Sequence, residues 1–243
     1  AIDDESLNVL GRWPWSRGVH AELINRLKAI DNRAVAMDLL LLEAQSTDDL
    51  ADRLLAAAIA AHGHVILPVA PIIDGNTGTL MLAQPIPGIF QHAILGHVDI
   101  ELDSDGVARR VFLYAGINTP SWFSLALALL DPAAAMKVNP LRNPEMVTTE
   151  SSNHWVRAQE RLIPYAARPD GIKTVSYSKV LFDDDTLASL RNKTIIVGMT
   201  ATGMGSRFVT PASLFNHQSI TGAEWHAHVF SMLKNNRGIT TLS

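Results

Sequence analysis

Short apolar runs alternate with helical patterns over the first part of the chain, and this alternation restricts the fold more than any other sequence feature. Residues 34–42 form an apolar run with a single charge, which is typical of a strand buried on both faces of a parallel sheet. A helical pattern at 19–30 precedes this run, and another at 48–61 leads into a second apolar run at 64–69. The alternation predicts an α/β fold with a mixed, mainly parallel central sheet flanked by helices.

The middle of the chain predicts an antiparallel hairpin inserted into this sheet. Two strand-like segments, 96–102 and 109–115, flank a turn with the sequence Asp103-Ser104-Asp105-Gly106. A final helix is expected at 222–235. Further elements are expected as helices at 122–130 and 183–190, strands at 161–165, 174–177 and 194–198, and a loop at 140–153.

The bulk composition restricts the classes of function. The chain has 243 residues, which is compatible with one domain spanning residues 1–243. It contains no cysteine, which excludes disulfides and thiolate metal sites, and its net charge of −4 argues against nucleic-acid binding. Three long stretches lack charged residues, but proline and other turn-forming or polar residues interrupt each of them, so we expect no spanning helix.

Two further patterns are weak as cofactor or metal sites. The apolar strand at 194–198 runs into a glycine-rich loop, but the loop lacks the lysine of a phosphate-binding loop and does not open a helix. His226 and His228 are two residues apart on the expected last helix, so their rings point in different directions. We therefore expect no cofactor and no metal.

Candidate ligand-binding residues follow from the expected sheet. Side chains just beyond the carboxyl ends of parallel strands line the crevice where ligands usually bind. By this reasoning the candidates are Asp3, Asp4, Arg17, His20, Asp38 and Thr200. The alternative is structural: Asp3 and Asp38 cap helices or pair with arginines. For Trp13 and Trp15, packing over one end of the core is favoured over a ligand-binding aromatic patch.

A set of sequence blocks occurs in order along the chain, at residues 1–7, 10–17, 35–38, 96–99, 105–111, 195–205, 210–211 and 222–226. Together these blocks resemble the type 2 CHASE domain, a sensory domain associated with cyclases and histidine kinases. The chain departs from that family at Ser206, where an acidic residue is common, and in the leucine run after Asp38, where an aromatic residue is usual.

The resemblance implies an extracytoplasmic (periplasmic) domain of an inner-membrane protein, excised between one preceding membrane helix and several following ones. It implies an unknown small-molecule or protein ligand, a homodimer, and a cyclase or kinase output module outside this chain, where any catalytic activity would reside. Two alternatives stay open. One is an α/β enzyme, hydrolytic or nucleotide-using, with Asp3, Asp38 and His20 as its acid and base groups. The other is an interaction module without a small ligand.

Overall fold

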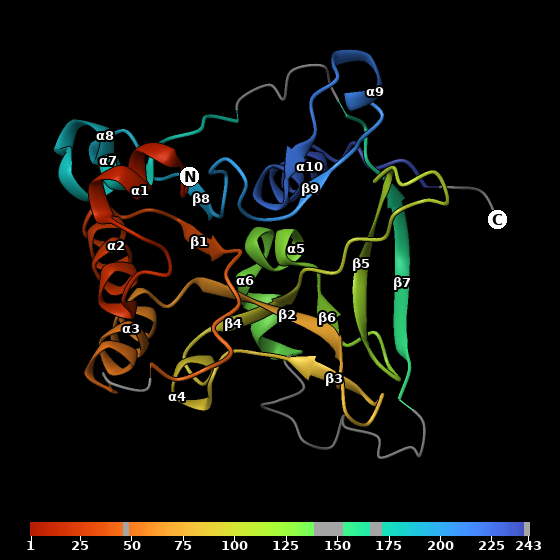
Figure 1. The fold of residues 1–243 in the computed structure, drawn as a ribbon, viewed down its shortest axis with the longest axis horizontal. Coiled ribbons are helices and arrows are strands. Elements are labelled where there is room, and N and C mark those ends of the chain that lie inside the picture. The colour runs from red at the N-terminus through yellow and green to blue at the C-terminus, as the bar shows by residue number, and fades with distance from the viewer. Residues whose placement is uncertain (46–48, 139–152, 166–171, 241–243) are drawn as a thin grey trace.

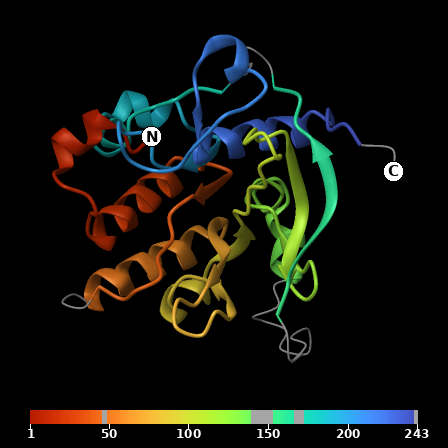
Figure 2. The ribbon, with the colours of Figure 1, turned by 45° about the vertical axis from the view of Figure 1, so that its right-hand side comes forward.

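The computed structural model describes residues 1–45, 49–138, 153–165 and 172–240. Its elements form four layers that follow one another from left to right in Figure 1: helices, a mainly parallel sheet, a second set of helices, and an antiparallel sheet. Turning the molecule shows the two outermost layers on opposite sides, with the N-terminal helices at one side and the long antiparallel strands at the other (Figure 2).

The parallel sheet is the centre of the fold. Its strands in spatial order are β4 (Ile94–His97), β2 (Val65–Ile73), β1 (Ala34–Met37) and β8 (Thr194–Val197). Ile2 adds a parallel bridge to Met199 beyond β8, and β3 (Leu80–Ala83) pairs antiparallel with the second half of β2. All four residues of β1 are buried, because helices cover both faces of the sheet.

One face of the sheet packs against the N-terminal helices. Leu23, Ile24 and Leu27 of α2 form a core with Val35 and Met37 of β1. Each such side chain stabilises the fold by roughly 1.5–3 kcal/mol when buried. The helices on this side are α1 (Asp4–Leu10), α2 (Arg17–Ala29), α3 (Asp49–His62), α4 (Pro87–Phe90), α7 (Tyr177–Phe182) and α8 (Asp184–Ala188).

The opposite face packs against α5 (Leu125–Leu130), α6 (Pro132–Lys137) and α10 (Gly222–Lys234). The outer side of α5 and α10 is covered by a third core that includes Trp225 and Val229. This third core lies against the antiparallel sheet of β6 (Trp122–Phe123), β5 (Arg110–Ile117) and β7 (Trp155–Leu162). A small ribbon of β9 (Arg207–Phe208) and β10 (Ile220–Thr221), with α9 (Ser213–Asn216) between them, precedes α10.

The predicted fold class is confirmed: the protein is α/β, with a mixed, mainly parallel sheet flanked by helices and an antiparallel insertion. The pairing inside the insertion differs from the prediction. The first of the two expected strands is β4, which joins the parallel sheet beside β2, and β5 pairs with β6 and β7 instead. Gly96 explains this, since a Cβ there would lie 2.9 Å from the Cα of Leu125, so β4 packs directly under α5.

Two expected strands have different bounds. The run at 34–42 leaves the sheet after Met37; Leu39 and Leu41 then pack into the core, whereas Leu40 and Leu42 are exposed. The strand expected at 64–69 is longer, because β2 continues to Ile73. Beyond Val69 it pairs with β3, and within the described chain no strand pairs with its other edge, where proline is tolerated.

The remaining predicted strands, helix and loop agree with the structure only in part. Tyr177 begins α7 and does not end a strand, because Ser176 is the N-cap of that helix. The strand expected at 161–165 is β7, which begins and ends earlier. The strand at 194–198 and the last helix are confirmed as β8 and α10. The loop expected at 140–153 lies almost wholly outside the described residues.

Candidate ligand-binding crevice

A cavity of about 680 Å³ opens at the carboxyl ends of β1, β4 and β8. Its walls come from residues 13–20 at the start of α2, 38–43 after β1, 98–100 after β4, and 199–208 after β8, together with the first turns of α10. Ligand pockets typically enclose about 300–1,000 Å³. The cavity therefore has the size and the position at the sheet edge that small-molecule sites favour.

Asp38 lies at the end of β1, where the strand meets the start of α10. Its backbone N–H donates to the carbonyl of Val197 at 2.8 Å, which fixes the residue at the sheet edge. Its carboxylate lies against the N-terminus of α10, since a Cβ on Gly222 would be 2.9 Å from Oδ2. The described part of the chain offers this half-buried carboxylate no hydrogen bond or ion pair. The N-terminus of α10 presents its partial positive charge to this carboxylate.

His226 lies one turn further along α10 and also lines the cavity. The side chain is 1% exposed, and its Nδ1 atom meets no hydrogen-bond partner among the described residues. Burial lowers the pKa of His226, and the neighbouring Asp38 carboxylate opposes this effect. The ring is therefore neutral near neutral pH, with one nitrogen able to accept or donate depending on the tautomer.

A second buried histidine, His97 at the end of β4, lies near His226. Burial lowers the pKa of His97 to about 4, with the carboxylate of Asp99 opposing the shift. Its ring packs against Trp155 of β7, whose indole N–H donates to Asp99 at 2.9 Å. Neutral, closely packed side chains thus connect the region beneath the cavity with the antiparallel sheet.

Arg17 and His20, both predicted for the site, line the cavity but already have partners. The Nε atom of Arg17 is 3.0 Å from Asp52 of α3, and its Nη2 atom donates to the carbonyl of Glu43 at 2.7 Å. His20 is hydrogen-bonded through Nδ1 to the hydroxyl of Tyr177 at 2.9 Å. Burial, and secondarily Arg17, lowers the pKa of His20 to about 4. These two residues therefore hold the wall in place.

The aromatic residues before α2 form part of this wall. The rings of Trp13 and Trp15 are 5.2 Å apart in an edge-to-face arrangement, and the indole N–H of Trp15 donates to the carbonyl of Gly11. Trp15 belongs to the main core and Trp13 packs against it, so the packing interpretation is confirmed. Both residues also line the cavity.

Asp3, Asp4 and Thr200, the other three predicted residues, do not line the cavity. Asp3 is the N-cap of α1, and its Oδ1 atom accepts from the Ser6 backbone N–H at 2.9 Å and from the hydroxyls of Ser6 and Ser176 at 2.6 and 3.0 Å. Asp4 accepts from the hydroxyl of Thr202 at 2.8 Å. Thr200 donates its N–H to the carbonyl of Ile2. Of the six predicted residues, three thus line the cavity, and the other three hold the N-terminus to the sheet.

A family comparison identifies the type of domain. The CHASE2 domain model matches residues 1–242, essentially the whole chain. The chain belongs to the CHASE2 domain family. CHASE2 domains are extracytoplasmic sensory domains. Neither a curated protein nor a solved structure gives a match to the sequence.

Within the described parts of this CHASE2 domain, no helix has both the length and the apolar character required to cross a bilayer. The same residues contain no group of three or more histidine, aspartate or glutamate side chains arranged to hold a metal ion. A second depression of about 500 Å³ lies over the turn at 101–110, but its arginines are already paired with Asp103 and Asp105.

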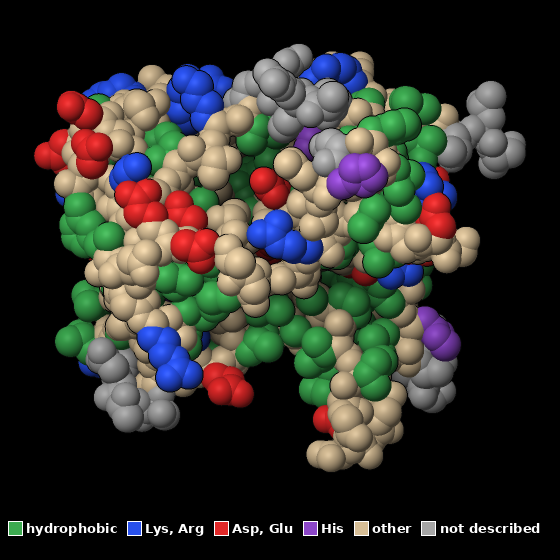
Figure 3. Space-filling model, turned by 45° about the horizontal axis from the view of Figure 1, so that its top comes forward, with side chains coloured by type: hydrophobic (Ala, Val, Ile, Leu, Met, Phe, Trp, Pro, Cys, Tyr) green, Lys and Arg blue, Asp and Glu red, His purple; other side chains and the backbone are tan. Residues whose placement is uncertain are grey.

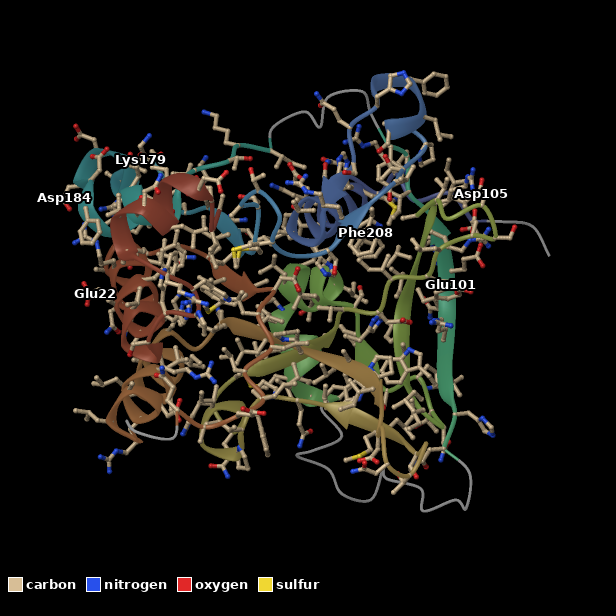
Figure 4. All side chains as sticks on the ribbon, viewed as in Figure 1. Glu22, Glu101, Asp105, Lys179, Asp184 and Phe208 are labelled. Carbon is tan, nitrogen blue, oxygen red and sulfur yellow. The ribbon has the colours of Figure 1, made fainter. Side chains whose placement is uncertain are left out.

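The sequence reasoning did not assign Phe208 and His226 to the site. Figure 4 shows Phe208 near the middle of the view, close to α10. Glu22, by contrast, projects from α2 away from the rest of the domain. The one available signal was spacing: His226 follows Gly222 by four residues and so lies on the same face of the helix. Nothing local indicated that this face would meet Asp38, which lies far earlier in the chain.

Proposed function

We propose that this CHASE2 domain is the sensory input domain of a membrane-bound bacterial receptor and that it binds a small molecule in the cavity. The observation that carries the proposal is the position of Asp38. Its side chain faces the cavity and also touches the first turn of α10, the last helix of the described chain. A ligand that engages this carboxylate therefore acts directly on the start of α10.

Transmission through α10 is the second part of the proposal. A Cβ on Gly198 would lie 2.6 Å from the Cβ of Ala223, so the end of β8 and the first turn of α10 are packed without spare room. The same helix packs on α5 and, through Trp225 and Val229, against the antiparallel sheet. A ligand shifts such a structure by its differential affinity for two arrangements, commonly about 1–3 kcal/mol.

The family supports placing the domain outside the cytoplasm. We propose the periplasmic side of the inner membrane, with membrane helices flanking the domain and a cyclase or kinase as the output module. We also propose that the domain acts as a homodimer. Hydrophobic side chains exposed on the surface support association (Figure 3), with Phe215 of α9 86% exposed and Ile73 of β2 65% exposed. Sedimentation over a range of concentrations measures this association.

An enzymatic function gains no support from the geometry. The hypothesis required Asp3, Asp38 and His20 to act on one substrate. Asp3 caps α1 away from the cavity, and His20 is buried and hydrogen-bonded to Tyr177. Of the three, Asp38 alone faces the cavity without a partner in the described chain.

Thermal-shift screening of the 243-residue chain against a panel of small metabolites tests ligand binding. We expect a compound that stabilises the domain saturably, by about 2.7 kcal/mol at one hundred times its dissociation constant, and is recovered chemically unchanged. Ser206→Trp narrows the cavity and should abolish the shift, because this exposed residue lies on its wall. Ser189→Trp, an equally large change at an exposed position of another surface, is the matched control.

Hydrogen exchange then tests transmission. With the compound bound, we expect slower exchange in peptides covering residues 38–43 and the first turns of α10. Conversion of the compound would favour an enzyme. Unchanged binding in Ser206→Trp would place the ligand elsewhere, and unchanged exchange in α10 would refute the transmission route.

A further inference from the structure

The charged residues around the cavity differ in whether they have a partner in the described chain. Arg17, Asp38 and Glu43 are the lining residues with formal charge at neutral pH. The side chain of Arg17 is only 14% exposed, and its guanidinium is held by Asp52 and the carbonyl of Glu43. Glu43 is exposed at the end of the wall. The inner part of the cavity thus presents one charge without a partner in the described chain, the carboxylate of Asp38.

The start of α10 is a poor site for an anion despite its positive dipole. A capping box engages two of the donors at this helix end: Glu224 accepts from the N–H of Thr221 at 2.7 Å, and the hydroxyl of Thr221 accepts from the N–H of Glu224. Asp38 adds a second carboxylate at the same helix end. An anionic ligand here would meet like charges, which raises its energy, whereas a cation would meet opposite ones.

His226 supplies a second polar group next to Asp38. Its Nδ1 atom is buried, lacks a partner among the described residues, and belongs to a ring that lines the cavity. An unpaired buried nitrogen costs stability until something hydrogen-bonds to it. An ammonium group has three N–H donors and a guanidinium has five, so either can satisfy a carboxylate and a neutral imidazole together.

The remaining walls are apolar and aromatic. Trp13 contributes from the segment before α2, Ile100 from the segment after β4, and Met204 from the loop after β8. The Phe208 ring lies close to the carboxylate, because a Cβ on Gly222 would be 3.9 Å from its Cε2 atom and 2.9 Å from Oδ2 of Asp38. Aromatic faces attract cations, and apolar walls bury a hydrocarbon body.

We infer that the cavity takes a small organic cation, an amine or guanidine carried on an apolar body, with its charged group between Asp38 and His226. This inference rests on the proposed sensory function and specifies its ligand class. Asp38 directly follows β1 and His226 belongs to α10, so a cation bound between them would bridge these two elements.

Charge-selective labelling of a single cysteine tests the inference without knowledge of the natural ligand. The chain contains no cysteine, so one introduced thiol is the only target. Val98→Cys places a thiol on the cavity wall, and Val9→Cys, at a position 57% exposed on α1, is the matched control. The probes are two methanethiosulfonates of similar size, one bearing trimethylammonium and the other sulfonate. If Val98→Cys does not fold, Ser206→Cys provides a second wall position.

We expect the ratio of cationic to anionic labelling rates to be about fivefold higher at the cavity thiol than at the control thiol, because of the nearby carboxylate. Adding Asp38→Asn should lower the ratio at least about threefold, whereas adding Glu43→Gln should leave it nearly unchanged. Calorimetry with three ligands of matched shape gives an independent measure. Phenethylammonium should bind at least about tenfold more tightly than 2-phenylethanol, with 3-phenylpropanoate weakest, and Asp38→Asn should remove the preference.

The outcomes separate the two proposals. If neither reagent labels either cavity thiol, the cavity is closed to solutes, and the proposed sensory site fails with it. If both reagents enter but the sulfonate is favoured, or Asp38→Asn leaves the ratio unchanged, the cation assignment is overturned and the sensory cavity stands. An amine that binds no more tightly than the alcohol also overturns the assignment.

Discussion

Two aspartates at the carboxyl edge of the parallel sheet have opposite surroundings. Asp3 follows the residue that bridges to the end of β8, and Asp38 follows β1 on the other side of that strand. Three donors converge on Oδ1 of Asp3, from Ser6 and Ser176. The carboxylate of Asp38 receives no hydrogen bond within the described chain and faces a cavity. The same residue type at the same edge thus anchors the fold in one place and lies open to solutes in the other.

The difference follows from the residues that come next in the chain. Asp3 is followed three positions later by Ser6 and by the free N–H groups of a new helix, so it finds its donors locally. Asp38 is followed by four leucines, whose side chains carry no hydrogen-bond donor. The carboxylate of Asp38 therefore stays available at the cavity wall, as the proposed ligand site requires.

The largest contrast is expected in stability. Asp3→Ala should lower the free energy of unfolding by about 2–3 kcal/mol, because it removes a helix cap and leaves the buried hydroxyl of Ser6 without its acceptor. Asp3→Asn should lose less, since asparagine also caps helices. Asp38→Asn should change stability by less than about 0.5 kcal/mol. Urea unfolding measures all three, and equal losses at Asp3 and Asp38 would erase the proposed distinction.

The fold of the parallel layer could be predicted because its signals are local. The fully apolar runs that became β1 and β8 indicated strands covered on both faces, and the helical spacing of Leu23, Ile24 and Leu27 predicted the face of α2 that now fills the core. The last helix, expected at 222–235, is α10 (Gly222–Lys234), and Asp3 is a helix cap, as the structural alternative held.

The antiparallel layer could not be predicted in the same way. The main partner of β5 is β7, more than forty residues later, and no local turn joins them. The turn at Asp103–Gly106 does form, with the N–H of Gly106 donating to the carbonyl of Asp103. It is held by the ion pairs of Arg109 with Asp103 and Asp105, without a strand on its first side.

The site was predictable only where the local position of a residue in the chain indicated its role. Strand-end position identified Asp38, and helix-start position identified Arg17 and His20. The opposite wall, with Phe208 and His226, comes from residues almost two hundred positions away and depends on how α10 docks on the sheet. Long-range docking leaves no pattern in a single sequence.

The second expected effect is on the pH dependence of stability. The buried histidines around the cavity and the N-terminal Asp3 should affect stability in separate pH ranges. Burial lowers the pKa values of His20 and His97 to about 4. Between about pH 6.5 and 4 the unfolded chain therefore takes up protons that the folded chain does not, and each histidine should reduce stability by about 1.4 kcal/mol per pH unit. His97→Phe should remove one histidine's share of this slope, which urea unfolding at a series of pH values measures.

Asp3 belongs to the lower range. Its partial burial raises the pKa, but hydrogen bonds from Ser6 and Ser176 outweigh this, and the pKa is lowered. Its contribution is therefore complete above about pH 4 and is lost as the pH falls through the folded-state value. Urea unfolding at a series of pH values resolves the two ranges; a pH dependence that Asp3→Asn flattens above pH 5 would contradict the assignment.

The smallest expected effect tests the contact between Asp38 and α10. Alanine usually stabilises a helix relative to glycine by roughly 0.5–1 kcal/mol. Gly222→Ala should instead destabilise the domain by about 1 kcal/mol, because the new Cβ would lie 2.9 Å from Oδ2 of Asp38 and displace the carboxylate. With Asp38→Ala in place the same change should become stabilising, giving a coupling of about 1 kcal/mol or more in a double-mutant cycle. Additive effects would mean that the carboxylate moves aside freely, and Asp38 would then not couple the cavity to α10.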